Sequence, residues 1–519
     1  MTSKLTLMSA IQTNRIDVNE WPATVLGAVC DVNPKRSRNP DPAEVSFIPM
    51  ASVEAEQGAI HAHEVRSSES VRKGYTRFED GDVIFAKITP CMENGKSAIA
   101  TGLTGGVGYG STEFHVLRPG PEVLSEWVFH FVRQQAFRND ARDNFTGTAG
   151  QARVPTDFMR NAEIPLPPLD EQQRIVSILR RALADIREGK EALARVPAQM
   201  KRFRQSVLAQ AFRGELTADW RAEHADRFRE AAEWFDAHIQ SPEARTANEE
   251  ITPELLAKIP PEVQHWLPGD RLLQVILAER RAKWERVQIA KPNPKARIAK
   301  SCPSVLSQAG LITTATEFWD TSSLGALTDV QGGIQKQPSR APKNFAFPFL
   351  RVANVHRGRL DLTEMHQIEL LGDIELERLR LLAGDLLIVE GNGSPSEIGR
   401  MAVWDGSVED CVHQNHLIRA RPATHVLPEW IEGFWNSPEG IEAVEFVSSS
   451  TSGLHTLSVG KVSKLPIPVA SMAEQSEIVA RIKTIFAEAE STNATAARAL
   501  TNLRRLEQST LQAAFRGDL

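Results

Sequence analysis

The chain has 519 residues and a formal net charge of −6, which excludes a protein that coats nucleic acid through an overall basic surface but not one with a local basic face. No run of 18 apolar residues occurs and the first 20 residues hold no apolar core, so neither a membrane span nor a signal peptide is expected. Cys30, Cys91, Cys302 and Cys411 lack CxxC spacing, which predicts reduced thiols in a cytoplasmic protein.

The two halves of the sequence repeat each other. A period this long is not that of a solenoid, whose units run roughly 20–50 residues. It predicts two copies of a whole domain, each with a trailing helix. The matches keep their order at offsets between 298 and 303: 21–32 with 319–330, 81–87 with 384–390, 165–176 with 466–479, and 208–216 with 511–519.

After an N-terminal segment, 1–20, the first copy opens with a strand-rich domain at 21–164. Short apolar runs such as Val83–Phe85 are bounded by Gly, Pro and Asp, which is typical of strands. One helix is predicted at Ser125–Ala141. The run Gly105–Gly110 lacks G-x-G-x-x-G spacing and precedes a strand, so it is interpreted as a turn and not as a nucleotide-binding loop.

A long helix follows within 165–216, with Asp170 as its expected N-cap. Pro197 is expected to kink or break it, and Gly214 to end it. Apolar residues recur at alternating steps of four and three, which predicts a coiled-coil seam. The predicted seam is Ile175, Leu179, Ala182, Ile186, Gly189, Leu193, Val196, Met200, Phe203 and Val207.

Residues 217–310 have no counterpart and are predicted to be a helical insert with helices at Trp220–Ala237 and Leu272–Val287, followed by a basic, proline-containing linker. The second domain, 311–465, has its helix at Pro428–Phe446, and the second long helix lies within 466–519. The middle of its seam is small, so a close approach of the two long helices is expected. This second seam is Ile478, Ile482, Ile485, Ala489, Thr492, Ala496, Ala499, Leu503 and Leu506.

Together these features resemble the specificity subunit of type I restriction–modification enzymes. Three paired motifs carry the resemblance, and it covers about 400 of the 519 residues. The motifs are the Pro-Leu-Pro-Pro-Leu-x-Glu-Gln block at 165–176 with its looser copy at 466–479, the Phe-Arg-Gly-acid-Leu ends at 212–216 and 515–519, and the Gly-Asp-hydrophobic blocks at 81 and 384.

The resemblance implies an α+β fold with two pseudo-repeated target-recognition domains separated by two long antiparallel coiled-coil helices. It implies a non-catalytic subunit whose domains each read one half of a bipartite site on double-stranded DNA. The helices would set the spacing, since about 40 helical residues span roughly 60 Å against roughly 34 Å for a DNA turn. They would dock two modification subunits, which bind S-adenosylmethionine and methylate adenine, with two restriction subunits as optional partners. This chain itself would need no cofactor and no metal.

Reading DNA requires Arg, Lys, Asn, Gln or His side chains on exposed segments, although an ordinary solvated surface is the alternative for any single residue. The candidates in the first domain are Arg66, Arg72, Lys73, Arg77, Asn94, Lys96, Gln151 and Arg153. Those in the second domain are Lys336, Arg351, Asn354, Arg357, Arg359, Gln414, Asn415 and His455.

The segment Cys411–His416 admits three interpretations. Gln414 and Asn415 have side chains suited to adenine. Cys411 and the two histidines form a C-x-H-x-x-H pattern, but a zinc site needs a fourth ligand, and none has an obvious position. The third interpretation is an ordinary strand or turn.

Two other functions stay open. One is an enzyme with an unrecognised DNA-modifying site, although the sequence holds neither a phosphate-binding G-x-x-x-x-G-K-[ST] loop nor the Asn/Asp-Pro-Pro-aromatic tetrapeptide typical of adenine methyltransferases. The other is a pseudosymmetric protein–protein scaffold, which the net negative charge leaves open.

Overall fold

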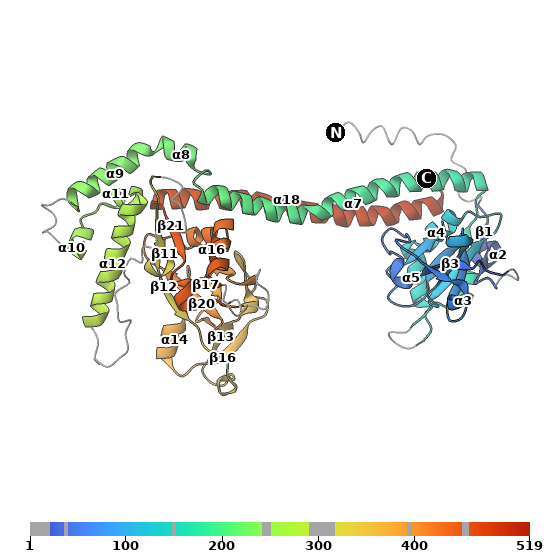
Figure 1. Cartoon of the computed structure of the whole chain (residues 1–519), viewed down its shortest axis with the longest axis horizontal. Coiled ribbons are helices and arrows are strands. Elements are labelled where there is room, and N and C mark those ends of the chain that lie inside the picture. The colour runs from blue at the N-terminus through green and yellow to red at the C-terminus, as the bar shows by residue number, and fades with distance from the viewer. Residues whose placement is uncertain are drawn as a thin grey trace. The chain divides into compact units, whose positions relative to one another are not determined.

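The computed structural model of the chain describes residues 21–35, 40–147, 152–240, 251–289, 317–391, 397–448 and 456–519. These residues form two compact units. Unit 1 lies within Met1–Val196 and Ala494–Leu519, and unit 2 within Pro197–Asn493. Each unit holds one strand-rich domain and parts of two long helices, α7 (Leu169–Phe212) and α18 (Met472–Arg516) (Figure 1).

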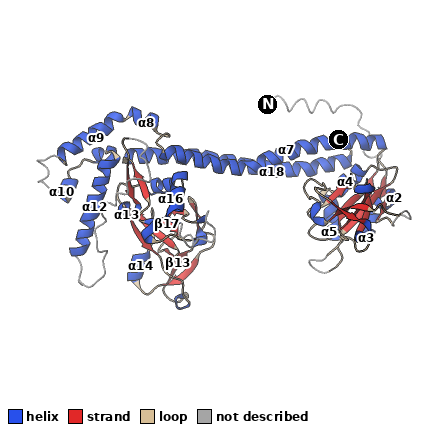
Figure 2. Ribbon diagram, in the orientation of Figure 1, coloured by secondary structure: helices blue, strands red, loops and turns tan. Residues whose placement is uncertain are grey.

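The N-terminal domain of unit 1 contains two four-stranded sheets (Figure 2). The first has the order β2 (Cys30–Val32), β9 (Phe114–Pro119), β6 (Val83–Ala86) and β7 (Ser97–Ile99), with every pair antiparallel. The second has the order β4 (Glu64–Ser67), β3 (Glu44–Ile48), β8 (Val107–Gly110) and β5 (Thr76–Glu79), with β3 and β8 parallel. Short elements complete the domain: β1 (Ala23–Val25), α2 (Leu26–Val29), α3 (Ser68–Val71), α6 (Thr156–Asn161) and β10 (Glu163–Pro165), of which β1 and β10 pair.

Strand β6 shows why this domain has two apolar layers. All four of its residues are fully buried, and successive side chains of a strand point to opposite faces. Val83 and Phe85 join the cluster around Trp127 of helix α4 (Ser125–Val132), whereas Ile84 joins the cluster around Phe78 of the second sheet. The first sheet is therefore covered on one face by helices and on the other by the second sheet.

The C-terminal domain of unit 2 repeats the first sheet and three strands of the second. Its first sheet has the same order, β12 (Thr328–Gly332), β20 (Leu417–Pro422), β17 (Leu386–Val389) and β18 (Met401–Val403). Its second sheet consists of β16 (His366–Glu369), β13 (Ala346–Leu350) and β19 (Val412–His413), which have the order and directions of β4, β3 and β8. Within the described residues this sheet has no strand equivalent to β5, and a separate hairpin is present, β14 (Val355–His356) and β15 (Arg359–Leu360). The smaller elements are β11 (Asp320–Ser323) paired with β21 (Pro466–Val469), α13 (Leu324–Leu327), α14 (Asp373–Leu379) and α17 (Val459–Val462).

The long helices run antiparallel to each other in each unit. In unit 1, Arg174 of α7 donates to the carbonyl of Leu519 just after α18, while Lys190 pairs with Glu507. In unit 2, Arg204 of α7 pairs with Glu490 of α18. Further along, the Leu216 carbonyl accepts from Arg481. In both units contacts move backward along α18 as they move forward along α7, so the antiparallel pairing expected from the sequence is confirmed.

Both long helices end in the same hydrogen-bonded motif at the predicted glycines. Gly214 and Gly517 each have φ of 72°, a conformation that glycine adopts without steric cost. Glu215 N–H donates to the Gln210 carbonyl at 2.9 Å, and Asp518 N–H to the Ala513 carbonyl at 2.9 Å. These bonds satisfy carbonyls that a helix end otherwise leaves without partners.

Four predictions about the long helices were wrong in detail. Helix α7 begins at Leu169, and the Pro168 carbonyl already accepts from Gln172 N–H, so Asp170 lies in the first turn and is not the N-cap. Of the two outcomes expected at Pro197, a kink or a break, the break does not occur, because helix α7 is continuous through this residue. Three predicted seam positions face solvent, because the contact line drifts by a residue along each helix: Phe203 is 44% exposed, Leu506 is 50% exposed, and Thr492 is exposed.

The shorter helices were predicted in the right places but as single pieces. The helix expected at Ser125–Ala141 is two, α4 and α5 (Gln135–Asp143), because Gln134 between them is extended. Its copy is also two, α15 (Pro428–Trp435) and α16 (Pro438–Ser448), with a proline at the first position of α16. The insert helix expected at Trp220–Ala237 is α8 (Ala218–Glu223) and α9 (Ala225–His238).

The rest of the insert consists of α10 (Pro253–Leu256), α11 (Pro261–Trp266) and α12 (Gly269–Ile289), which contains the second predicted insert helix. Buried insert residues such as Phe235, Leu272 and Ile276 belong to the same apolar cluster as Trp430 and Ile467 of the C-terminal domain. The insert is therefore part of the core of unit 2. Within the described part of the chain, no helix is both long and apolar enough to cross a membrane.

Candidate nucleic-acid interface

A repeated junction joins each strand-rich domain to the long helices. In unit 1 the buried amide of Gln172 accepts from Leu124 N–H at 2.9 Å and donates to the carbonyls of Glu122 and Pro167. In unit 2, 303 positions later, Gln475 accepts from Leu427 N–H at 2.9 Å and donates to two equivalent carbonyls. The glutamine of the Glu-Gln block therefore fixes the start of a helix to the loop that precedes α4 or α15.

The aromatic residue of each Phe-Arg-Gly end closes the other side of this junction. Phe515, at the end of α18, lies 4.3 Å from the Trp127 ring centre in unit 1. Phe212, at the end of α7, lies 4.9 Å from Trp430 in unit 2. Each domain thus contacts the beginning of one long helix and the end of the other.

The basic stretch predicted in the first domain lies on and around the second sheet. Arg66 on β4 pairs with Glu64 and stacks 3.8 Å from the centre of the Phe47 ring. Arg77 on β5 pairs with Asp41 at 2.8 Å and with Glu79. Arg72 and Lys73, directly after α3, are both exposed. Arg66 and Arg77 thus pair with carboxylates of their own domain, and Arg72 and Lys73 are exposed beside them.

A second group in this domain gathers where residues 152–153 pair with the segment after β6. Arg153 bridges to Ile88 through its backbone, and its guanidinium forms an ion pair with Glu113 at 2.8 Å, which lowers the pKa of that carboxyl. Lys96 donates to the Met50 carbonyl at 2.9 Å, and Asn94 is exposed. Gln151 lies outside the described residues.

In the second domain the structure brings together three separate candidate segments. Asn415 N–H donates to the Ile334 carbonyl, and Gln414 N–H to the Leu350 carbonyl, both at 2.9 Å. Lys336 follows Ile334 by two residues and is exposed, and Arg351 directly follows Leu350. Lys336, Arg351, Gln414 and Asn415 therefore come from three strand ends that are hydrogen-bonded to one another.

The other candidates of this domain lie around the β14–β15 hairpin. Asn354 is 2% exposed, and its side chain accepts from Arg351 N–H and donates to the carbonyls of Asp361 and Glu364, so it stabilises the turn. Arg357 is half-buried and donates to the Ile398 carbonyl, whereas Arg359 is exposed on β15. His455 lies outside the described residues.

The histidine-containing segment is an ordinary strand in its first half. Cys411 and His413 are both fully buried. Burial raises the pKa of the Cys411 thiol to about 12 and lowers the pKa of His413 to about 3, so both are neutral near pH 7. His416 is exposed and lies 3.3 Å from Glu390. No group of three or more His, Cys, Asp or Glu suited to a metal ion occurs among the residues that the structure describes.

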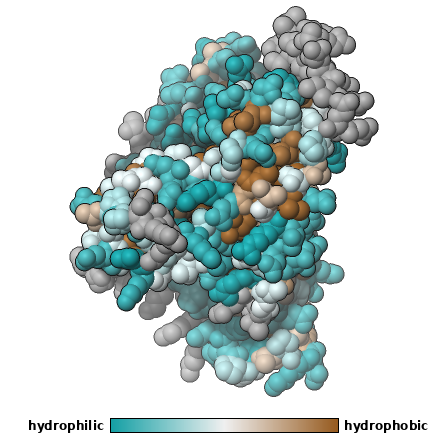
Figure 3. All heavy atoms as spheres, turned by 90° about the vertical axis from the view of Figure 1, so that its right-hand side faces the viewer, coloured by the Kyte–Doolittle hydropathy of each residue, from teal (hydrophilic) through white to brown (hydrophobic). Residues whose placement is uncertain are grey.

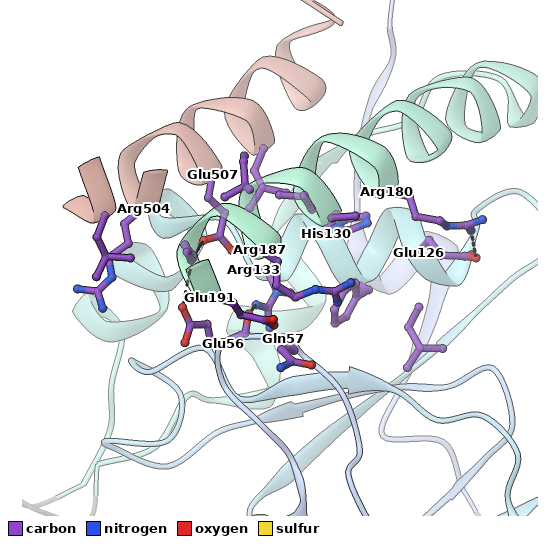
Figure 4. Close-up of a pocket in the computed structure, with 18 of the residues that line it drawn as sticks. Glu56, Gln57, Glu126, His130, Arg133, Arg180, Arg187, Glu191, Arg504 and Glu507 are labelled. Carbon is purple, nitrogen blue, oxygen red and sulfur yellow. Dashed lines mark hydrogen bonds and ion pairs between the residues drawn. The ribbon is translucent and has the colours of Figure 1, made fainter. Parts of the chain in front are cut away.

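The sequence did not indicate the polar cluster between α4 and the long helices in unit 1 (Figure 4). It lines a cavity of about 450 Å³. Lys190 contacts Glu507 and lies 3.3 Å from Glu56, and Arg133 donates to the Glu56 carbonyl at 2.7 Å. Burial lowers the pKa of His130 to about 3, so this ring is neutral. The sequence feature that could have indicated this cluster is Lys190, a charged residue directly after the predicted seam residue Gly189.

The described surface of unit 1 is mostly hydrophilic in the view of Figure 3, with apolar residues gathered in one area. Two of the large apolar residues exposed in this unit are Val25 of β1 at 38% and Leu169 at the start of α7 at 43%. Two more lie among the DNA-contact candidates: Val65 of β4, next to Arg66, is 53% exposed, and Tyr75, between Lys73 and Arg77, is 38% exposed.

Comparisons with known proteins agree with this layout. Residues 19–194 match the model of the type I restriction modification DNA specificity domain. The chain is 30% identical over 363 residues to the type I restriction enzyme EcoAI specificity subunit of Escherichia coli, covering 68% of this chain and 59% of that protein. It is 26% identical over 409 residues to the EcoKI specificity subunit of Escherichia coli strain K12, covering 78% and 68%.

A solved structure gives the same result for the fold. A chain from work on complex assembly and conformational transition of the type I R-M system matches 96% of this chain, and 98% of its own length, with a TM-score of 0.63 at 20% identity. The chain is therefore similar to type I restriction–modification specificity subunits, and the resemblance and the fold class expected from the sequence are confirmed.

Proposed function

We propose that this chain is the DNA-recognition subunit of a type I restriction–modification complex. Each strand-rich domain reads one half of a bipartite target on double-stranded DNA, and the long helices set the spacing between the half-sites. The observation that carries the proposal is that the two domains share their first sheet, their helix junction and three strands of the second sheet, but differ in the fourth strand, in the β14–β15 hairpin and in the candidate contact residues around them.

This division matches the needs of bipartite recognition. Contacts to phosphates fix the register of a protein on DNA, while contacts to base edges carry the sequence information. A shared scaffold presents both domains to the helices in the same way, and unlike second sheets present different side chains to different bases. The exposed Lys73, Asn94, Lys336 and Arg359 are the best placed for DNA contact, because none has an ion pair or side-chain hydrogen bond within the described structure.

The partners and chemistry of the complex form the second part of the proposal. The long helices dock two modification subunits, which bind S-adenosylmethionine and methylate adenine, and two restriction subunits join when the host supplies them. This chain contributes recognition and no catalytic group. It works in the cytoplasm with its DNA.

The decisive experiment exchanges one domain in the full-length chain. Residues 21–164 are replaced by the corresponding domain of a family member with a different target, and the chimera is produced in cells with the modification subunits. Methylome sequencing should show a bipartite adenine motif in which one half has changed and the other half and the spacing have not. A control chimera exchanges residues 172–196 of α7, which should leave both half-sites unchanged.

The same chimeras and the purified proteins distinguish the proposed function from its alternatives. If both halves of the motif change, or neither does, the assignment of one domain to one half-site is wrong. If the purified chain alone transfers labelled methyl groups to DNA, it is an enzyme. If its complex with the modification subunits retains DNA no better than those subunits alone, and without salt dependence, a protein–protein scaffold is the better description.

A further inference from the structure

A buried cation of α7 meets a carboxylate of α18 in unit 1. The Lys190 side chain is only 10% exposed, and its ammonium contacts Glu507, whose side chain is 19% exposed. The same ammonium lies 3.3 Å from Glu56 of the N-terminal domain. A buried lysine that loses both carboxylates would be a buried charge without a counter-charge, which is strongly destabilising. The helix that packs against α7 beside Lys190 must therefore supply a carboxylate.

Unit 2 has a second pair between the same two helices. Arg204 of α7 pairs with Glu490 of α18, and its guanidinium carbon lies 5.2 Å from the Phe486 ring centre. This pair is more exposed, with 38% of the arginine side chain accessible. Here too the cation comes from α7 and the carboxylate from α18.

The internal repeat relates the two pairs to each other. The two helices correspond without insertion from Gln172 to Gly214 and from Gln475 to Gly517, at a constant difference of 303 in residue number. The positions that match are Arg187 with Glu490, Lys190 with Asn493, and Arg204 with Glu507. At these three equivalent positions α7 has only cations, while α18 has two carboxylates and an amide.

We propose that this sorting of charge makes α7 select α18 as its partner and reject a second copy of α7, and makes α18 reject a second copy of itself. In a like pair, the repeat would place Arg187 and Lys190 of one α7 against Arg204 of the other. A pair of α18 helices would place Glu490 against Glu507. Only the unlike pair brings opposite charges together at both levels.

Such selection matters because the two helices of an internal repeat are similar, so each could also pair with a second copy of itself. Apolar seams of two similar helices do not distinguish like from unlike partners, whereas charges beside a seam set partner choice in coiled coils. The burial of Lys190 strengthens the discrimination, because a like charge there would also be desolvated. The selection keeps the two unlike domains together as a pair, and it does not depend on their binding DNA.

The test uses full-length chains with reversed charges, all carrying Glu56→Gln so that Lys190 has one carboxylate partner. The acidic chain has Arg187→Glu, Lys190→Glu and Arg204→Glu, which gives both helices acidic positions. The basic chain has Glu490→Lys and Glu507→Lys, which gives both helices basic positions. A fourth protein combines all five reversals, and a control reverses the exposed Arg195, Lys201 and Arg202 of α7.

The melting temperature is measured first. The acidic and the basic chain should each melt several degrees below the Glu56→Gln parent, and the chain with all five reversals should regain most of that loss. The control reversal, which changes the net charge as much as the acidic chain does, should melt within about 2 °C of the parent, because surface pairs contribute little. No recovery in the combined chain would overturn the proposal.

Partner choice is measured second, by native mass spectrometry of chains coexpressed with different tags. The parent should be a monomer of about the 57.4 kDa chain mass. The acidic and basic chains should combine as a one-to-one dimer when coexpressed, because each finds opposite charge only on the other. Self-association of either chain to the same extent, or the absence of any mixed dimer, would show that charge does not select the partner.

Discussion

The two units share one half of their domains and differ in the other. Asp82 and Asp385 show how closely the shared half agrees, because each binds an arginine of the neighbouring strand, Arg118 or Arg421, with both oxygens at 2.7–2.8 Å. Beyond this first sheet, β16, β13 and β19 keep the order and directions of β4, β3 and β8. The described residues of unit 2 form no strand equivalent to β5, the β14–β15 hairpin is added, and the polar residues differ. The helix junction constrains the first sheet, and the second sheet is free to vary with whatever it contacts.

The insert is the other difference between the units. In unit 2 the buried Glu474 accepts from Thr217 at 2.9 Å and from the Trp319 indole at 2.7 Å, and it pairs with Arg221 of the insert. Its equivalent in unit 1, Glu171, pairs with the half-exposed Arg174. The equivalent indole, Trp21 Nε1, is buried without a hydrogen-bond partner among the described residues. In unit 2 the insert thus supplies buried hydrogen-bond and ion-pair partners to Glu474, whereas Glu171 of unit 1 pairs with a half-exposed arginine.

The largest expected effect comes from the two equivalent glutamates. Glu474→Gln should lower the free energy of unfolding of unit 2 by about 4 kcal/mol, because it leaves the buried Arg221 without a counter-charge. Glu171→Gln should cost about 1 kcal/mol or less, because its partner is 48% exposed. Hydrogen exchange resolved by peptide measures each unit separately. Equal costs would mean that the insert does not strengthen the site.

Phe212 and Phe515 should show the opposite result, a symmetric cost. Each is 7% exposed and packs against the tryptophan of the domain in its unit. Phe212→Ala should destabilise unit 2, and Phe515→Ala unit 1, by about 3 kcal/mol each. Local hydrogen exchange again assigns the loss. A cost confined to one of the two variants would show that the junctions are alike in geometry but not in energy.

The sequence predicted the features that depend on local pattern. Helix ends at Gly214 and Gly517, strands such as β6 with its buried run, and the pairing of two seams all follow from spacing and residue type. The sequence did not predict the features that depend on contacts between residues far apart in the chain. Gln134 is not a helix-breaking residue, yet it separates α4 from α5. The break is indicated only in the second copy, where Pro438 stands at the position equivalent to Gln135.

The candidate interface shows the same limit more strongly. A basic residue in a sequence cannot be assigned to DNA or to a carboxylate of its own domain, because Arg77 finds Asp41 from 36 positions away and Arg153 finds Glu113 from 40. The gathering of Lys336, Arg351 and Gln414 at three bonded strand ends was equally hidden, since it depends on sheet topology. The contacts of the sixteen candidates with DNA stay a prediction.

Glu432 of α15 should give unit 2 a pH dependence that unit 1 lacks at the equivalent position, Phe129. Burial raises the Glu432 pKa from 4.5 to about 7 while the carboxyl accepts from Val403 N–H. Since the folded state holds this proton more tightly than the unfolded state, stability is fully present below pH 4.5 and is lost as the pH rises through 7. Glu432→Gln should therefore stabilise unit 2 by about 3 kcal/mol at pH 8 and by nothing at pH 4.5. A constant difference across this range would contradict the assigned proton.

The smallest effect, on DNA binding, should come from exposed lysines near the second sheet of each domain. Lys73→Gln and Lys336→Gln should each lower the slope of log affinity against log salt by about 1 and weaken binding by about 1 kcal/mol, because each removes one phosphate contact. Lys201→Gln, an equally exposed change on α7, should alter neither quantity. Fluorescence anisotropy of the complex with its modification subunits, on the bipartite target, measures the slope. If all three variants keep the parental slope, neither lysine contacts DNA, and the divergence of the second sheets needs another explanation.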